Sequence, residues 1–299
     1  GVGFSRISVN PSLSIIYKLN YAWRFTAHAS YKERYGEMTD LYDRPYQTDY
    51  RNSVWNCGIL PVYRQQLYSV YGEYKNTARE FFATVNLTHN REWYNRIYEQ
   101  RIENGQVQRV SLPLSNHGSR YTVKSTLSKG FYELGLKTSF LVLLNISKAE
   151  QISGGQRLPY QYRLMRLEPK VIWTPNRHWE TSYQTDIRYG GNKIGERTRL
   201  APLWNVTQQV QLSYIFSPIE ASLSVDHYHN DVNEDQSVNA VFADFSVSWK
   251  SGRWQITATA TNLFDKRTYA YTRYASLESY TSWVRIRPRE FLVAIRYQL

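Results

Sequence analysis

The last eleven residues, 289–299, constrain the fold of this chain more than any other stretch. Side chains of one parity are all apolar or aromatic: Phe291, Val293, Ile295, Tyr297 and Leu299. Those of the other parity are mixed: Leu292, Ala294, Arg296 and Gln298. Because successive side chains of a strand point to opposite faces, this segment predicts a strand with one apolar face. Such a strand at the end of a chain is typical of the strand that closes a membrane β-barrel, since open strand edges cannot face lipid.

Similar alternation recurs along the whole chain, and no helical period fits these segments. It predicts thirteen strands, at residues 11–19, 22–35, 62–76, 79–95, 117–131, 134–149, 159–174, 178–191, 203–216, 219–231, 238–250, 252–273 and 279–299. Many of them exceed the roughly 9–11 residues that a tilted strand needs to cross a bilayer. The sequence therefore predicts an all-β fold, an antiparallel transmembrane β-barrel whose walls continue above the membrane.

The connections between these segments alternate between short and long. The predicted long connections are 36–61, 96–116, 150–158, 192–202 and 232–237. This rhythm is typical of barrels with tight periplasmic turns and longer external loops. Trp249 and Trp254 flank one short turn, where an interfacial aromatic girdle is expected.

Composition agrees with a wall of this kind. The chain has 26 Tyr and 9 Trp, yet its mean hydropathy is -0.57, and no apolar run is long enough for a transmembrane helix. A soluble β-sandwich would also alternate, so composition alone does not decide. The net charge of +12 suits lipid A phosphates, anionic substrates, a basic lumen or nucleic acid, although the strand periodicity disfavours nucleic acid. Cys57, the one cysteine, provides neither an intrachain disulfide nor a metal-ligand set.

An odd number of strands is unusual, because single-chain bacterial barrels have even numbers. Either a strand has been missed, within residues 3–10, or residues 1–299 are the C-terminal part of a larger barrel. We favour the second interpretation. The chain also begins without Met, as a processed or excerpted piece would.

The stretch from Asn262 to Tyr269, Asn-Leu-Phe-Asp-Lys-Arg-Thr-Tyr, follows a threonine-alternating segment and precedes the terminal strand. This arrangement resembles the end of TonB-dependent outer-membrane receptors. Residues 280–289, the Asp40-Leu41-Tyr42-Asp43 stretch and Phe242-Ala243-Asp244 resemble the Bacteroidetes branch of that family. Leu299 departs from the pattern, because the family commonly ends in Phe.

The resemblance implies a 22-stranded barrel with a preceding plug domain and a TonB-contacting segment, and residues 1–299 contain neither the plug nor the first strands. It implies energised uptake of a nutrient ligand rather than catalysis. The implied partners are outer-membrane lipid and lipopolysaccharide, the barrel-assembly machinery through the C-terminal strand, the TonB complex through the absent N-terminal region, and a surface lipoprotein, with no nucleic acid. The alternatives are a complete porin-like passive channel of about 14 strands, an outer-membrane barrel enzyme and, more weakly, a soluble all-β binding protein.

Ligand contacts are expected in the segments 36–61, 96–116 and 274–279, where aromatic rings and cations are interleaved. The candidate residues are Tyr42, Tyr46, Tyr50, Trp55, Trp93, Tyr94, Arg96, Tyr98, Arg101 and Tyr274. Packing of these loops against their neighbours is the competing explanation for the same residues.

No catalytic residue, metal site or cofactor is expected. His227 and His229 share one strand face, but their parity continues that of apolar residues and places them on the outer face. The acidic residues of lumenal parity, which are Glu168, Asp186, Asp226 and Asp244, show no spacing that converges with a nucleophile, so they are interpreted as solvated wall charges.

Overall fold

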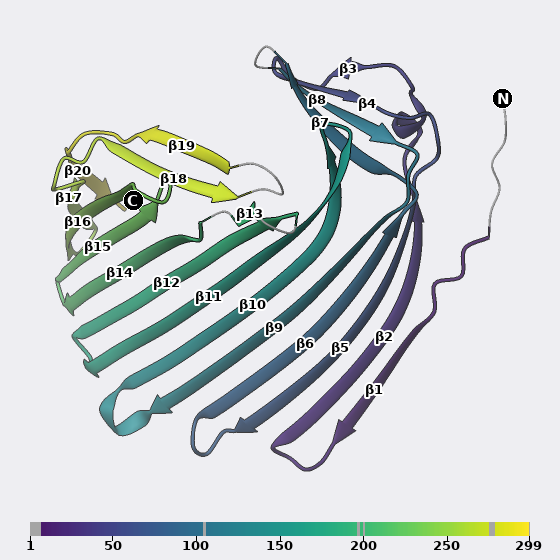
Figure 1. The fold of residues 1–299 in the computed structure, drawn as a ribbon. Helices are drawn as coiled ribbons and strands as arrows, with labels where there is room; N and C mark the ends of the chain where they lie inside the picture. Colours follow the sequence, from purple (N-terminus) through teal and green to yellow (C-terminus); the bar gives the residue numbers. More distant parts are fainter. Residues whose placement is uncertain (1–6, 104–105, 196–197, 200, 275–278, 299) are drawn as a thin grey trace.

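The computed structural model describes residues 7–103, 106–195, 198–199, 201–274 and 279–298. Within them, thirteen antiparallel strands form one continuous wall. They are β1 (Ser12–Lys18), β2 (Trp23–Tyr35), β5 (Val62–Asn76), β6 (Phe81–Tyr94), β9 (Asn116–Phe131), β10 (Leu136–Ser153), β11 (Gln156–Asn176), β12 (Trp179–Ile194), β14 (Leu203–Phe216), β15 (Ile219–Asp231), β16 (Ser237–Ser251), β17 (Trp254–Thr261) and β20 (Glu290–Tyr297). Each pairs with the next along the chain (Figure 1). The predicted antiparallel wall is confirmed.

The remaining elements lie at one end of the wall, where the long connections gather (Figure 1). They are the strands β3 (Tyr46–Gln47), β4 (Asn52–Trp55), β7 (Ile97–Glu103), β8 (Gln106–Leu112), β13 (Thr198–Arg199), β18 (Thr268–Tyr274) and β19 (Ser279–Arg285), and the 3-10 helix η1 (Met38–Leu41). A second 3-10 helix, η2 (Tyr132–Leu134), forms a turn at the other end. No helix in the described part of the chain is long and apolar enough to span a membrane.

Asparagine side chains shape several of the short turns. The Oδ1 of Asn20 accepts hydrogen bonds from the backbone N–H groups of Ala22 and Trp23, both at 2.9 Å, in the turn between β1 and β2. Asn76 and Asn176 accept backbone N–H groups in the same way in the turns after β5 and β11. These local bonds favour tight reversals over further strand, as short polar side chains do at turns. The long connections therefore collect at the opposite end.

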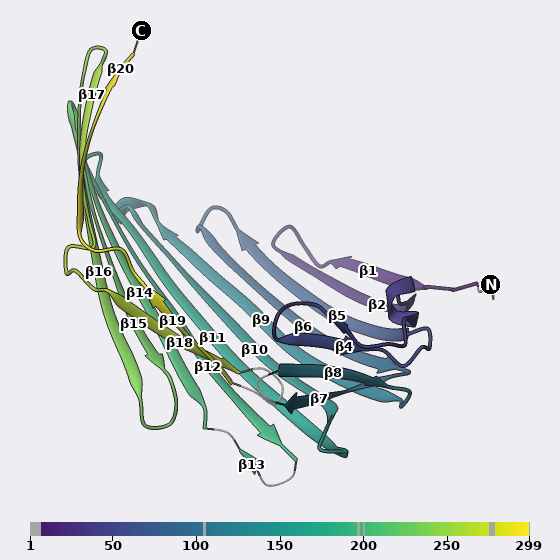
Figure 2. The same ribbon diagram turned by 90° about the horizontal axis from the view of Figure 1, so that it is seen from above.

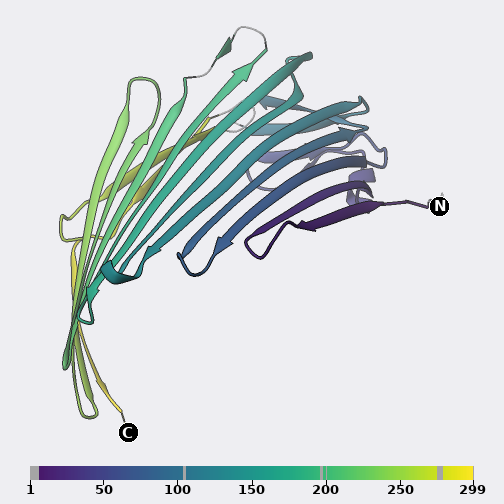
Figure 3. The same ribbon diagram turned by 90° about the horizontal axis from the view of Figure 1, so that it is seen from below.

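The wall is curved and, in its described part, open (Figures 2 and 3). Its first strand, β1, pairs only with β2, and its last strand, β20, pairs only with β17. These two edge strands lie at opposite ends of the arc in all three views. The described residues thus form an arc of a barrel wall rather than a closed ring.

The two faces of the wall differ as the parity predicts. We call the face covered by β18 and β19 the inner face, and the opposite one the outer face. Aromatic pairs line the outer face near the short turns: Trp23 and Tyr74 have ring centroids 4.7 Å apart, Trp179 and Tyr214 4.6 Å, and Trp254 and Tyr297 4.8 Å. Trp249 lies on the same face, 40% exposed. An exposed apolar face edged with Trp and Tyr is the pattern of a lipid-facing wall.

The chain departs from the prediction after Thr261. The predicted strand 252–273 ends there, and Asn262 and Asp265 take left-handed backbone conformations with φ of 50° and 49°. The side-chain amide of Asn262 donates to the carbonyls of Lys266 and Arg287, both at 2.8 Å, and its Oδ1 accepts from the Lys266 N–H at 3.0 Å. The chain then turns away from the wall into the β18–β19 hairpin and returns as β20, so the predicted strand 279–299 is also wrong: β19 ends at Arg285, and β20 begins at Glu290. The first part of the stretch that carries the resemblance, residues 262–267, is therefore a turn that leads into this hairpin, and only Thr268 and Tyr269 belong to a strand.

Candidate ligand vestibule

The predicted loops 36–61 and 96–116 are joined into a small sheet. The β7–β8 hairpin is antiparallel, β4 runs parallel to β8, and β3 pairs with β4. We call these four strands the loop sheet. Its core contains Ile97 and Val110, which are buried, and Ile152 of β10 is buried with them. Alternating apolar residues in 97–112 allow this pairing, which sequence parity alone could not assign to a partner.

Ion pairs and hydrogen bonds connect the two loops and tie them to the wall. Arg96 contacts Asp40 at 2.9 Å and so connects the two loops, and within the first loop Asn56 donates to the carbonyl of Thr39 at 3.1 Å. The buried Glu99 contacts Arg101 at 2.6 Å and accepts the backbone N–H of Gly155 at 3.0 Å. The Arg101 guanidinium, followed by the Gly155 N–H, lowers the pKa of Glu99 below its usual range, against the opposing effect of burial. These contacts therefore hold the loop sheet in place at the end of the wall.

A hollow of about 460 Å³ lies between the loop sheet and the inner face of β6, β9, β10 and β11. Its described lining includes Tyr94, Tyr98, Arg109, Arg120 and Tyr160. We call this hollow the vestibule. Rings and guanidinium groups thus face one another across it.

Two arginines lie against the ring of Tyr98 in the vestibule. The guanidinium carbon of Arg109 lies 3.7 Å from its ring centroid, and that of Arg96 lies 5.0 Å away. Burial raises the pKa of the Tyr98 hydroxyl, although the two arginines oppose that effect. The hydroxyl is therefore neutral at ordinary pH, and it can donate or accept a hydrogen bond.

Two arginines of the vestibule have no carboxylate partner among the described residues. Arg109 lies on Tyr98, and Arg120 donates to the hydroxyl of Ser147 at 3.2 Å. Two carboxylates also line the vestibule: Glu92 accepts the Tyr94 hydroxyl at 3.1 Å and contacts Asn90, and Glu150 pairs with Arg157 at 3.0 Å. The vestibule can therefore offer two arginines to an anionic ligand, and Lys148 also lines it.

The structure brings together only some of the residues that the sequence suggested. Tyr94 and Tyr98 line the vestibule, and Arg96 supports it through Tyr98. Trp93 has the opposite parity to Tyr94 and lies on the outer face, opposite His117. Arg101 is occupied by Glu99.

The remaining candidates lie away from the vestibule. Tyr42 and Tyr46 form an edge contact with ring centroids 6.0 Å apart, and Trp55 donates its indole N–H to the carbonyl of Asp43 at 2.8 Å. Tyr50 is 79% exposed and stacks with its neighbour Arg51. The side chain of Tyr274 lies outside the described residues. Their role as ligand contacts stays a prediction.

Sequence reasoning missed Arg109, Arg120 and Tyr160. Arg120 and Tyr160 sit at inner parity near the loop end of β9 and β11, a signal that a search restricted to loops passes over. Arg109 lies within a predicted loop, but its position on Tyr98 depends on the β7–β8 hairpin. Long-range pairing, not local pattern, assembles these three residues.

A second hollow of about 530 Å³ lies on the inner face beneath the β18–β19 hairpin, where Tyr269 and Tyr271 face the wall. Arg166 makes a two-point contact with Asp186, 3.0 Å at each oxygen, and it also contacts Glu168. Arg188 contacts the same aspartate at 2.6 Å. Each of these charges therefore has an oppositely charged neighbour.

His227 and His229 lie on the outer face, as expected, and each has its own neighbour. The Nδ1 of His227 is 3.2 Å from the Oε1 of Gln208, and the Nδ1 of His229 is 2.9 Å from the Oδ1 of Asn239. Among the described residues, no group of three or more His, Cys, Asp or Glu side chains could hold a metal ion.

Comparison with known proteins gives likeness in structure alone. No family model matches the chain, and no curated protein matches its sequence. The structure of FpvA from P. aeruginosa bound to pyoverdines is similar over 96% of this chain and 44% of that chain, with 11% identity and a TM-score of 0.50. The ferric yersiniabactin uptake receptor FyuA from Yersinia pestis is similar over 97% of this chain and 50% of its own, with 7% identity and a TM-score of 0.49.

The fold is that of a TonB-dependent receptor barrel. This is a fold of integral outer-membrane proteins, which agrees with the apolar outer face of the wall. The chain spans half or less of the length of these two receptors. At this level of identity the likeness concerns the fold, so the vestibule has to be judged by its own chemistry.

Proposed function

We propose that this chain forms part of an outer-membrane receptor barrel that takes up a nutrient ligand with energy supplied through TonB. One observation supports this most directly. The vestibule opens between the loop sheet and the inner face. Arg109 and Arg120, which have no carboxylate partner in the described part of the chain, line it beside three tyrosines. A ligand captured there would sit at the long-loop end of the lumen, which is the external end in barrels of this kind.

The lining indicates the class of ligand. Tyrosine rings stack against flat rings and sugar faces, and arginine adds cation–π contact and charge-assisted hydrogen bonds to anionic oxygens. The vestibule therefore suits an anionic ligand with at least one ring face. The pyoverdines bound to FpvA show that this fold can carry an organic ligand, but the nutrient taken up here has to be found by experiment.

We further propose that additional strands complete the wall to 22 and that a plug domain fills it. The exposed edges of β1 and β20 support the additional strands, because unpaired backbone groups facing lipid each cost several kcal/mol, on the order of a lost hydrogen bond or more. Contacts with TonB would then come through a region preceding these strands. The assembly-machinery and surface-lipoprotein partnerships and the Bacteroidetes type stay predictions.

The test uses the full-length gene in the bacterium that encodes it. Uptake of candidate iron complexes, glycans and cobalamin is compared in wild-type cells, in a strain lacking this gene and in a strain lacking TonB. We expect one ligand class to lose uptake in both deletion strains. Uptake that needs this gene but not TonB would instead support a passive channel, and ligand recovered in a chemically cleaved form would support a barrel enzyme.

The vestibule itself is tested by the double variant Arg109→Gln/Arg120→Gln. We expect at least a tenfold weaker binding of the imported ligand to whole cells. A matched control, Arg177→Gln/Arg253→Gln, removes two arginines near the short turns and should leave binding unchanged. Equal binding by the two double variants would contradict the vestibule as the capture site.

A further inference from the structure

A row of polar residues crosses the outer face near the long-loop end of the wall. In the strand register, Arg91 of β6 is opposite Ser119, Ser119 opposite Lys148, Lys148 opposite Gln161, and Gln161 opposite Lys193. We call these five residues the boundary row. Two residues closer to the membrane centre, His89 and Tyr121 face each other, and beyond them Leu87 faces Val123. The boundary row thus marks where the outer face changes from mainly apolar to basic, and Arg163, two residues closer to the membrane centre on β11, adds one further outward cation.

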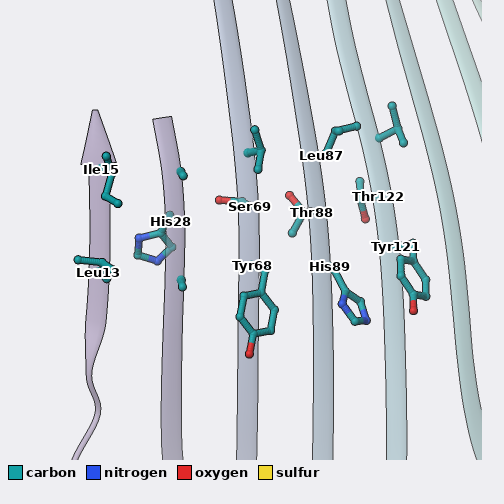
Figure 4. Close-up of a pocket in the computed structure, with 14 residues that line it drawn as sticks. Leu13, Ile15, His28, Tyr68, Ser69, Leu87, Thr88, His89, Tyr121 and Thr122 are labelled. Carbon is teal, nitrogen blue, oxygen red and sulfur yellow. The ribbon is translucent and has the colours of Figure 1, made fainter. Parts of the chain in front are cut away.

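An apolar groove of about 540 Å³ lies on the same face beside these strands. Ala27 and Ala29 of β2 form its floor. They pair with Ile15 and Leu13 of β1 on one side, and with Val70 and Tyr68 of β5 on the other. Because small side chains lie between two lines of large ones, the groove runs along β2, and Figure 4 shows Leu13 and Ile15 on its β1 side. Its largely apolar lining suits an acyl chain.

The groove connects with a polar hollow of about 580 Å³, lined by Arg91, His117, Lys148 and Lys193. His89 and Tyr121 line both. Their rings stack with centroids 4.2 Å apart and an interplanar angle of 5°, and Tyr68 lies alongside (Figure 4). The Nε2 of His89 is buried without a hydrogen-bond partner among the described residues. An unmatched polar atom therefore sits where the apolar and basic parts meet.

The charge of the polar hollow is not balanced by neighbouring acids. Within the described ranges, Arg91, Lys148 and Lys193 contact no carboxylate, and Arg91 lies over the outward ring of Trp93, 5.2 Å from its centroid. Two acidic residues do line the hollow. Glu150 pairs with Arg157 at 3.0 Å, and Glu92 belongs to the inner face, where Tyr94 and Asn90 occupy it. The outward cations remain available to an anion.

We propose that the boundary row and the groove bind a diphosphorylated glycolipid of the outer leaflet, with its phosphates on Arg91, Lys148 and Lys193 and an acyl chain in the groove. β6 and β12 are four strand steps apart, about 19 Å at the usual strand spacing, so one phosphate cannot contact both ends of the row. A headgroup with two separated phosphates matches that span. Cations beside the headgroup layer attract anionic lipids, and arginine and lysine bind phosphate oxygens through charge-assisted hydrogen bonds.

The experiment uses the full-length receptor in lipid nanodiscs. Binding of three probes is measured by native mass spectrometry: lipid A with two phosphates, lipid A with both phosphates removed, and inorganic phosphate. The triple variant Arg91→Gln/Lys148→Gln/Lys193→Gln is compared with Lys32→Gln/Lys124→Gln/Lys170→Gln, which removes three cations from the inner face. Heat-modifiable mobility on gels confirms that each variant is folded.

We expect the outer triple variant to bind diphosphorylated lipid A at least tenfold more weakly than the wild type, and the inner triple variant to change binding less than twofold. Wild-type receptor should bind the dephosphorylated lipid as weakly as the outer variant binds the intact one. Equal loss in the two triples, no loss in the outer triple, or displacement of the lipid by inorganic phosphate at equal concentration would overturn the proposal. If the outer triple does not fold, Lys148→Gln and Lys193→Gln singly should each weaken binding about threefold, and no change in either would overturn it.

A second variant separates the groove from the charges. Ala27→Leu/Ala29→Leu fills the groove floor and should weaken binding of the intact lipid while leaving its dependence on the phosphates unchanged. Unchanged affinity in this variant would exclude the groove as the acyl site. Ligand uptake plays no part in these measurements, so failure of the uptake proposal and failure of this one are distinguishable.

Discussion

In the wall, neighbouring strands pair over seven to eighteen residues, and one face of each strand is apolar. In the loop sheet and the β18–β19 hairpin, strands of two to seven residues depend on a few specific side chains, such as Glu99 in the loop sheet and Asn262 at the base of the hairpin. The sequence pattern of the wall follows from its environment, because every second side chain along each strand faces lipid and is therefore apolar. The loop region is instead held together by individual polar contacts. A charge should therefore damage the wall wherever it faces lipid, whereas only particular substitutions should loosen the loop region.

The largest effect is expected from a charge on the outer face. Leu144 of β10 lies on that face between Val123 and Met165, and it is 40% exposed. Leu144→Lys should destabilise the folded receptor by about 2–4 kcal/mol, the cost of a lysine near the bilayer midplane. Unfolding by urea in lipid vesicles measures this. The matched control is Leu141→Lys, which faces the lumen opposite Glu168 and should cost less than about 1 kcal/mol. Equal costs would show that parity does not assign the faces.

The next effect concerns the turn that launches the β18–β19 hairpin. Asn262→Ala removes an amide that is buried and bonded to two carbonyls and one N–H, so it should destabilise the hairpin by about 1–3 kcal/mol. Hydrogen exchange of β18 should accelerate while that of β17 stays slow. Asn262→Gly tolerates the left-handed backbone, so comparing the two variants separates backbone strain from lost hydrogen bonds. Slow exchange throughout the hairpin in both variants would mean that other contacts hold it.

A pH effect of intermediate size is expected at Glu99. Its pKa is lowered in the folded chain, so its contribution to stability is present above the unfolded pKa, about 4.3, and is lost as pH falls through the folded value. Acidification below about pH 4 should therefore open the loop sheet first, which limited proteolysis within residues 97–112 detects. Glu99→Gln should be cut readily at pH 7 and should lose the extra opening on acidification. An unchanged acid response in this variant would assign the effect to another carboxylate.

The smallest effect is expected at the link between the two loops. Arg96→Met removes the contact with Asp40 and a cation from Tyr98, and should cost about 1 kcal/mol or less because the pair is partly exposed. The expected result is a modest rise in the exchange rates of β7 and β8. Arg51→Met, which removes a cation from the exposed Tyr50 ring, serves as the control and should change nothing. Equal exchange rates of β7 and β8 in the two variants would show that the contact between Arg96 and Asp40 does not stabilise the loop sheet.

Much of the wall could be predicted from sequence. The boundaries of β5, β14 and β15 agree with the expected segments residue for residue, because an uninterrupted alternation ends there at turn-forming residues. The predicted strand 252–273 was wrong beyond Thr261, since the threonine alternation and the following Tyr-Ala-Tyr-Thr pattern read as one strand. The left-handed residues Asn262 and Asp265 break it, and nothing in a period-2 pattern reports such a turn.

The vestibule could be predicted only in part. Tyr94 and Tyr98 were found because aromatic residues cluster near a chain reversal, but Trp93, adjacent to Tyr94, faces the opposite side. Arg109 and Arg120 are eleven residues apart and gain their common role only when β8 folds back over β9.

The sequence by itself determined the wall: its strand number, its two faces and the end at which the long connections lie. It could do so because lipid on one side and an inner face on the other impose a local, residue-by-residue pattern. Only the tertiary structure decided which strands of the loop sheet pair, that β18 and β19 leave the wall, and which residues on five neighbouring strands form the boundary row. Those features depend on pairing between distant segments, and register between strands is a property of the assembled sheet rather than of any one stretch of sequence.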